Sequence, residues 1–141
     1  MSSGLKKWAS AAAVLVLVAA CAAPTRPDPE VNRYGVNVAA EHSGSSITLE
    51  PGQELVVRLA TLVSSTSEWS LVDFVPGVLA GQTAPQFERE NRVSNLNEAS
   101  GFEVWRFKPG TAGSVTLKFD YRRAYSLEPA AQTVTYTVTV R

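Results

Sequence analysis

Few side chains in this sequence have the chemistry of a catalytic or metal-binding group. The 141 residues include one cysteine, Cys21, and one histidine, His42. A zinc site, or a nucleophile activated by a base, needs several such groups at set spacings. His42 lies beside Ser43 and Gly44 without any such spacing around it. We therefore interpret His42 as a solvated loop residue, and we expect no metal, no cofactor and no enzymatic activity.

Glu88 and Glu90 are the nearest approach to a pair of catalytic carboxylates. Arg89 lies between them and Arg92 follows closely. Charged residues are common on the edge strand of a sheet, where they prevent pairing with other chains and remain solvated. The pattern favours a solvated edge strand over a catalytic site.

Cys21 stands at the end of an apolar run that follows two lysines, Lys6 and Lys7. This order is typical of a secretory signal, and the run at 8–20 is shorter than the roughly 20 residues that span a bilayer. Its end, Val18-Ala19-Ala20-Cys21, resembles the bacterial lipoprotein box. The resemblance implies that residues 1–20 are a signal peptide and that the Cys21 thiol carries lipid, with acyl chains such as palmitate. The alternative is an ordinary secretory signal with a chance cysteine.

Residues 21–33 are expected to form the lipidated cysteine and a flexible tether. Pro24, Pro27 and Pro29 interrupt this stretch, which has no apolar periodicity. Two acyl chains suffice for stable attachment, so we expect a protein of the cell envelope, anchored on the extracytoplasmic side of a bacterial membrane. The formal net charge is zero, which excludes the basic field of a nucleic-acid-binding protein.

Alternating apolar and polar residues indicate that the remaining domain, 34–141, is all-β. The alternation is strict at 114–121 and 133–140 and rich in β-branched and aromatic residues, as expected of half-buried strands. Further strands are predicted at 34–39, 46–49, 55–59, 69–74, 86–92 and 102–107. About seven to eight short antiparallel strands separated by turn signals indicate an immunoglobulin-like β-sandwich, with a small barrel as the alternative.

If consecutive strands run antiparallel, three polar loops meet at one end of the sandwich. These loops are 61–68, 93–101 and 122–131, and the tight turns at 50–52 and 108–110 lie at the other end. Loops gathered on a rigid sandwich are typical of a binding surface.

The loop at 122–131 holds side chains that neither flanking strand needs, namely Arg122, Arg123 and Tyr125. Arginine and aromatic residues dominate the energetics of protein interfaces, so Arg123 and Tyr125 are candidate anchors. The alternative is that the arginines extend over the sandwich end and Tyr125 packs on it.

A further pattern occupies the C-terminal part of the chain. It consists of Trp105-Arg106-Phe107-Lys108-Pro109-Gly110, Val115-Thr116-Leu117, Tyr121-Arg122-Arg123 and residues 129–140. These segments resemble the chagasin-like inhibitors of papain-type cysteine proteases, and the likeness extends from about Ile47 to Arg141. The resemblance implies an immunoglobulin-like sandwich whose loops at 61–69, 94–101 and 122–128 enter the active-site cleft of the protease and block it reversibly. We expect a papain-type cysteine protease as the partner and a monomeric inhibitor.

The loop motifs of this family transfer only in part. The first, Asn-Pro-Thr-Thr-Gly-Tyr-x-Trp, matches at the tryptophan, with Ser64 and Ser65 in place of the threonines. The glycine-rich second motif keeps Gly101, and the third, Arg-Pro-Trp, keeps an arginine and an aromatic residue. The residues that the resemblance assigns to protease-binding loops are Ser64, Ser65, Thr66, Trp69, Asn97, Ser100, Gly101, Arg123 and Tyr125.

An envelope adaptor is the second interpretation. The first loop lacks the proline and glycine of the family motif, so the loop end could have lost inhibition. The membrane-anchored sandwich would then bind another protein without inhibiting a protease.

Overall fold

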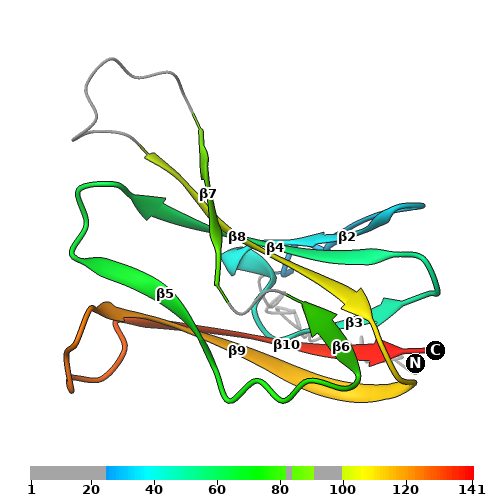
Figure 1. The fold of residues 1–141 in the computed structure, drawn as a ribbon. Coiled ribbons are helices and arrows are strands. Elements are labelled where there is room, and N and C mark those ends of the chain that lie inside the picture. The colour runs from blue at the N-terminus through cyan, green and yellow to red at the C-terminus, as the bar shows by residue number, and fades with distance from the viewer. Residues whose placement is uncertain (1–24, 82–83, 91–99) are drawn as a thin grey trace, which may run out of the picture.

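The computed structural model describes residues 25–81, 84–90 and 100–141, which fold into two β-sheets packed face to face (Figure 1). The strands in these residues are β1 (Glu30–Asn32), β2 (Gly35–Val38), β3 (Ser45–Leu49), β4 (Glu54–Leu62), β5 (Ser67–Val72), β6 (Leu79–Gly81), β7 (Gln86–Arg89), β8 (Ser100–Pro109), β9 (Gly113–Arg123) and β10 (Gln132–Val140). A short 3-10 helix, η1 (Ala40–His42), follows β2. Within these ranges no helix is long and apolar enough to cross a membrane. The β-sandwich predicted from the sequence is confirmed.

Strand pairing divides the described strands into two sheets. One sheet has six strands in the order β1-β2-β4-β8-β6, with β7 also paired to β8, and the other has the order β3-β10-β9-β5. The β2–β4 and β3–β10 pairs are parallel. The expectation of purely antiparallel strands therefore needs correction at these two pairs, because alternation along a strand is the same whichever way its neighbour runs.

The side chains that point inward from both sheets form one core. Its largest fully buried members are Trp105, Tyr136, Phe107 and Phe119. The Phe119 ring on β9 lies 4.9 Å from the Trp105 ring on β8 and 6.2 Å from the Tyr136 ring on β10, centroid to centroid. Aromatic pairs at these separations stabilise a core beyond their buried area. Phe119 therefore joins the two sheets at the centre of the sandwich.

Strand pairing also places two of the polar loops at one end. Leu62, at the end of β4, lies opposite Ser100, and Ser67, at the start of β5, lies opposite Arg123 at the end of β9. The β4–β5 and β9–β10 connections consequently lie together at the left of Figure 1, whereas the chain ends at the right. The predicted clustering is confirmed for these two loops, and residues 91–99 lie outside the described residues.

Several element boundaries differ from those expected. Glu30–Asn32, expected in the tether, forms β1 and pairs with β2. Strands β4 and β9 continue to Leu62 and Arg123, because a partner strand extends alongside each and the backbone ladder does not depend on apolar alternation. β1 and β6 are three residues long, too short to show a period in the sequence.

His42 has a local structural role. Its Nδ1 atom accepts a hydrogen bond from the backbone N–H of Ala39 at 2.8 Å, and its side chain is half-buried at the end of η1. The interpretation of His42 as a solvated loop residue is thus corrected. In the described part of the chain, no group of three His, Cys, Asp or Glu side chains is arranged to hold a metal ion.

The central position of Phe119 predicts a large loss of stability on truncation. Phe119→Ala should lower the free energy of unfolding by about 3–5 kcal/mol, because it leaves a cavity between the sheets. Val75→Ala is the control, since Val75 is 71% exposed, and it should change this free energy by no more than about 0.5 kcal/mol. Urea unfolding followed by tryptophan fluorescence measures both, and equal effects would contradict the packing described.

Candidate functional site

Ser65 holds the β4–β5 loop in a closed turn. Its backbone N–H donates to the Leu62 carbonyl at 3.0 Å, and its Oγ accepts from the Ser67 N–H at 3.0 Å. The same Oγ is hydrogen-bonded with the Tyr121 hydroxyl on β9 at 2.8 Å. Ser64 and Thr66, on either side, are exposed. Of the three hydroxyl residues predicted in this loop, one therefore supports the turn and two face solvent.

Trp69 supports the same loop from the core. The side chain is 5% exposed, its Nε1–H donates to the Ala60 carbonyl at 3.0 Å, and its ring lies 5.0 Å from the Tyr121 ring. A residue so enclosed cannot offer a large surface to a partner. The structure thus places Trp69 beneath the loop end.

The β9–β10 connection presents the most exposed side chains of the loop end. Tyr125 and Leu127 are fully exposed, with relative accessibilities of 106% and 103%, and Arg123 is also exposed. Local hydrogen bonds shape the turn: Ser126 N–H donates to the Arg123 carbonyl at 3.2 Å, and Glu128 N–H donates to Ser126 Oγ at 3.1 Å. The loop therefore directs apolar and basic side chains to solvent.

Tyr125 has an unusual backbone conformation. Its φ angle is +58°, in the left-handed region that is unfavourable for a residue with a side chain. Such residues concentrate at functional sites, where the surrounding structure holds them. The strain at Tyr125 therefore supports a binding role for the tip of this loop.

The two described loops are also tied to each other. The Ala124 N–H, just after β9, donates to the Thr66 carbonyl at 3.1 Å. Further along, the Ala131 N–H donates to the Tyr121 carbonyl at 2.8 Å and closes the β9–β10 loop at its base. The first and third predicted loops consequently form one connected edge.

Ser100 and Gly101 lie at the start of β8, where the middle predicted loop ends. Ser100 Oγ donates to a Glu90 carboxylate oxygen at 3.1 Å. Gly101 is buried, and a Cβ atom there would meet the Glu88 carbonyl and come within 2.6 Å of the Phe87 ring. Glycine is required here because the neighbouring strand β7, paired with β8 in the same sheet, lies too close for a side chain, so both residues are structural supports. Asn97, the other residue predicted in this loop, lies outside the described residues.

Arg122 is held by a buried carboxylate. Asp120 is 4% exposed, and its two carboxylate oxygens accept from Thr133 Oγ1 at 2.7 Å and from Arg122 Nη2 at 2.6 Å. Burial alone would raise the pKa of Asp120, but these hydrogen bonds, together with the charges of Lys118 and Arg122, outweigh it and hold the pKa below its usual value. The network fixes Arg122 on the sheet and fastens the start of β10 beside β9.

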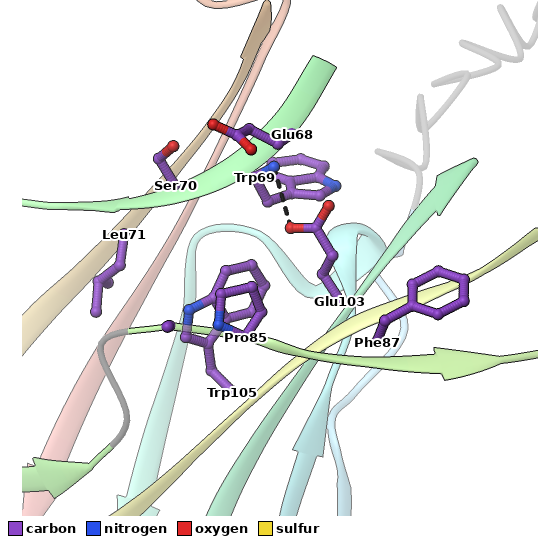
Figure 2. A pocket seen from close by; sticks show the side chains of 9 residues that line it. Glu68, Trp69, Ser70, Leu71, Pro85, Phe87, Glu103 and Trp105 are labelled. Atoms are coloured by element: carbon purple, nitrogen blue, oxygen red, sulfur yellow. Dashed lines mark hydrogen bonds between the residues drawn. The ribbon is translucent and has the colours of Figure 1, made fainter. Parts of the chain in front are cut away.

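A cleft of about 490 Å³ lies between β5 and strands β7 and β8 (Figure 2). Trp69, Phe87, Glu103 and Trp105 line it. The Glu103 carboxylate on β8 accepts a hydrogen bond from the backbone N–H of Trp69 at 3.2 Å. A side chain of one sheet therefore pairs with a backbone donor on β5, the edge strand of the other sheet. Burial raises the pKa of Glu103, the hydrogen bonds from Trp69 and Thr61 partly oppose this, and the charge of Glu68 adds to it. The cleft thus lies where the two sheets meet beside the loop end. Among its described lining residues there is no pair of a nucleophile and a base.

The sequence-based prediction omitted part of the exposed apolar surface. Leu62 and Val63, in and beside the first loop, are 52% and 48% exposed, and Leu127 is fully exposed. Large apolar side chains in a stretch assigned to a loop were the available signal, because a loop has little core in which to bury them. Together with Arg123 and Tyr125 they give the loop end the composition of a protein-binding surface.

Comparisons with known proteins agree with this geometry. The model of the family described as chagasin family peptidase inhibitor I42 matches residues 48–140. The structure is similar to that of the cysteine protease inhibitor EhICP2 from Entamoeba histolytica, with a TM-score of 0.65, 16% identity, and coverage of 74% of this chain and 94% of that one. It is also similar to the solution structure of Amebosin, with a TM-score of 0.59, 18% identity, and coverage of 74% and 96%. At these identities the structural likeness concerns the fold, and no curated protein sequence matches significantly.

The Asp120 network predicts a pH-dependent contribution to stability. Asp120→Asn should lower the free energy of unfolding by about 1–3 kcal/mol at pH 7, because it weakens hydrogen bonds to a buried charge. Since the pKa of Asp120 is lower in the folded state than in the unfolded state, the benefit is fully present above the unfolded value of about 4 and is lost as pH falls through the folded value. Urea unfolding of both proteins from pH 7 to pH 2 tests this, and a difference that stays constant would contradict it.

Proposed function

The chain belongs to the chagasin family of peptidase inhibitors, and we propose that it reversibly inhibits papain-type cysteine proteases by placing the loop end of the sandwich in their active-site cleft. The observation that carries the proposal is the connected edge formed by the β4–β5 and β9–β10 loops. It combines exposed apolar side chains with Arg123, and the Ala124 N–H joins the backbones of the two loops by its hydrogen bond to the Thr66 carbonyl.

Binding loops with a fixed conformation suit an inhibitor better than flexible loops do. A loop that is ordered before binding loses less conformational entropy when it enters a cleft, and so binds more tightly. The hydrogen bonds of Ser65 and Ala124 supply this restraint, although the first loop lacks the proline and glycine of the family motif. These hydrogen bonds therefore favour a protease inhibitor over an envelope adaptor that has lost inhibition.

Titration of the purified protein against papain and a cathepsin tests the function directly. Reversible inhibition at submicromolar to micromolar concentration is expected, with kinetics that show competition with substrate. The absence of inhibition at micromolar concentration would remove this proposal and favour the envelope adaptor, whose partner would be sought by capture on the intact protein.

Tyr125 provides a test that separates binding from folding. Tyr125→Gly removes the strain of a positive φ angle, so the melting temperature should stay equal or rise. The same change removes an exposed aromatic anchor, so the inhibition constant should increase about tenfold or more. Adding Arg123→Ala should weaken inhibition further, and Val75→Ala in the β5–β6 connection should have no effect. Unchanged inhibition by Tyr125→Gly would show that Tyr125 is not an anchor.

We also propose that the inhibitor is attached to the extracytoplasmic side of a bacterial membrane through lipid on Cys21. The support is the lipoprotein-like sequence Val18-Ala19-Ala20-Cys21 after a basic and apolar leader. Because two acyl chains give stable attachment, the inhibitor would act on proteases that reach the envelope.

Metabolic labelling with a fatty-acid analogue tests the anchor independently of inhibition. The native chain should incorporate the label and fractionate with membranes, whereas Cys21→Ser should incorporate none, because the thiol is the acceptor. Ser64→Ala serves as the control and should be labelled normally. Equal labelling of the native chain and Cys21→Ser would overturn the proposed anchor.

A further inference from the structure

The β4–β5 loop has no restraint of its own in its sequence. Residues 63–66 are Val-Ser-Ser-Thr, without proline or glycine, so neither a fixed φ angle nor a glycine-specific turn limits them. The closed turn instead depends on Ser65 Oγ, which accepts from the Ser67 N–H and is hydrogen-bonded with the Tyr121 hydroxyl at 2.8 Å. Besides the local hydrogen bonds of Ser65 with Leu62 and Ser67, the loop therefore also has a restraint from another strand.

Tyr121 is well placed to supply it. The residue lies on β9 opposite Trp69, and its ring packs against the buried Trp69 ring at 5.0 Å. Trp69 is fixed in turn by its hydrogen bond to the Ala60 carbonyl on β4. The Tyr121 hydroxyl is thus carried on a ring whose position is set by the core, and it reaches outward to the loop.

The same residue lies at the base of the β9–β10 loop. Its carbonyl accepts from the Ala131 N–H at 2.8 Å, and three residues later the Ala124 N–H donates to Thr66 in the first loop. Tyr121 is therefore linked to the first loop by its side chain and to the third loop by its backbone. The position of this one residue therefore bears on both loops.

We propose that Tyr121 is a positioning residue of the inhibitory edge, whose hydroxyl holds Ser65 so that the first loop fills the protease cleft without adopting a cleavable extended form. This inference rests on the proposed function. Tyr121 is half-buried, and it acts through Ser65 and Ser67, whose backbone it keeps in a turn. A turn of this kind differs from the extended conformation in which a peptide would be cut.

Removal of single hydroxyl groups tests the arrangement with little change in packing. Tyr121→Phe should raise the inhibition constant about tenfold, the loss expected for one hydrogen bond that orders a loop. Ser65→Ala should raise it at least as much, because it also removes the hydrogen bond from the Ser67 N–H. The double variant should be no weaker than Ser65→Ala alone, because that change already removes the contact with Tyr121. Ser65→Thr keeps a hydroxyl and should retain most of the inhibition. Additive losses, or unchanged inhibition by Tyr121→Phe, would overturn the proposal.

Ser114→Ala is a matched control for these variants. It removes another hydroxyl–hydroxyl hydrogen bond of 2.8 Å, between Ser114 and Thr139, at the end of the sandwich away from the loops. It should leave the inhibition constant unchanged. An equal loss in Ser114→Ala would show that inhibition follows general stability and not the position of the loop.

Cleavage of the inhibitor by the protease distinguishes a positioning residue from one that only stabilises the fold. During long incubation with papain, Tyr121→Phe should be cut between residues 62 and 67, whereas the native chain and Ser114→Ala stay intact, as followed by mass spectrometry. Cleavage of all three at the same rate, or of none, would contradict the positioning role.

Amide hydrogen exchange tests the contact even if the native chain inhibits no papain-type protease. In Tyr121→Phe the amides of Ser67 and Ala124 should exchange faster than in the native chain. The amide of Gly110 donates to the Val78 carbonyl at the end of the sandwich away from the loops, and its exchange should be unaffected. Unchanged exchange at Ser67 would contradict the inferred restraint, whereas faster exchange without inhibition would refute only the proposed function.

Discussion

The alternation of side chains along β9 is the constraint on which the rest of this structure depends. One face of the strand places Leu117 and Phe119 in the core, and the other holds the buried Asp120 beneath Arg122. Because β9 pairs with β5 on one side and β10 on the other, its register sets the positions of both described loops. Tyr121 follows in the same alternation, and its ring must therefore pack toward Trp69 while its hydroxyl reaches Ser65.

The β4–β5 loop shows how part of a binding edge can be restrained without proline or glycine. Three hydrogen bonds, between Ser65 and Tyr121, Ser67 and Ser65, and Ala124 and Thr66, replace the restriction that proline and glycine would give to the backbone. Tyr125 lies beyond this support in a strained conformation with its side chain in solvent. Stored strain and exposed apolar area are both unfavourable in the free protein, and both are consistent with selection for binding.

Much of the fold could be predicted from the sequence, because strict alternation in the segments that became β9 and β10 has only one regular interpretation. The parallel β2–β4 and β3–β10 pairs could not, since a strand pattern carries no information on the direction of its neighbour. At the loop end, the sequence motifs indicated which segments form the loops but not the role of each residue in them. Trp69 and Gly101 align with motif positions, yet the structure encloses Trp69 in the core and buries Gly101 against the neighbouring strand β7.

The sequence by itself determined the all-β class, the positions of the main strands, the family resemblance and the lipoprotein-like segment at Cys21. These depend on local periodicity and on short motifs, which can be read from neighbouring residues. Only the tertiary structure decided that Ser65 faces Tyr121, that Asp120 is paired with Thr133 and Arg122, and that Leu127 is exposed beside Tyr125. The reason is physical: hydrogen bonds and exposure depend on the register between strands far apart in the chain, and that register is set by the packing of the whole core.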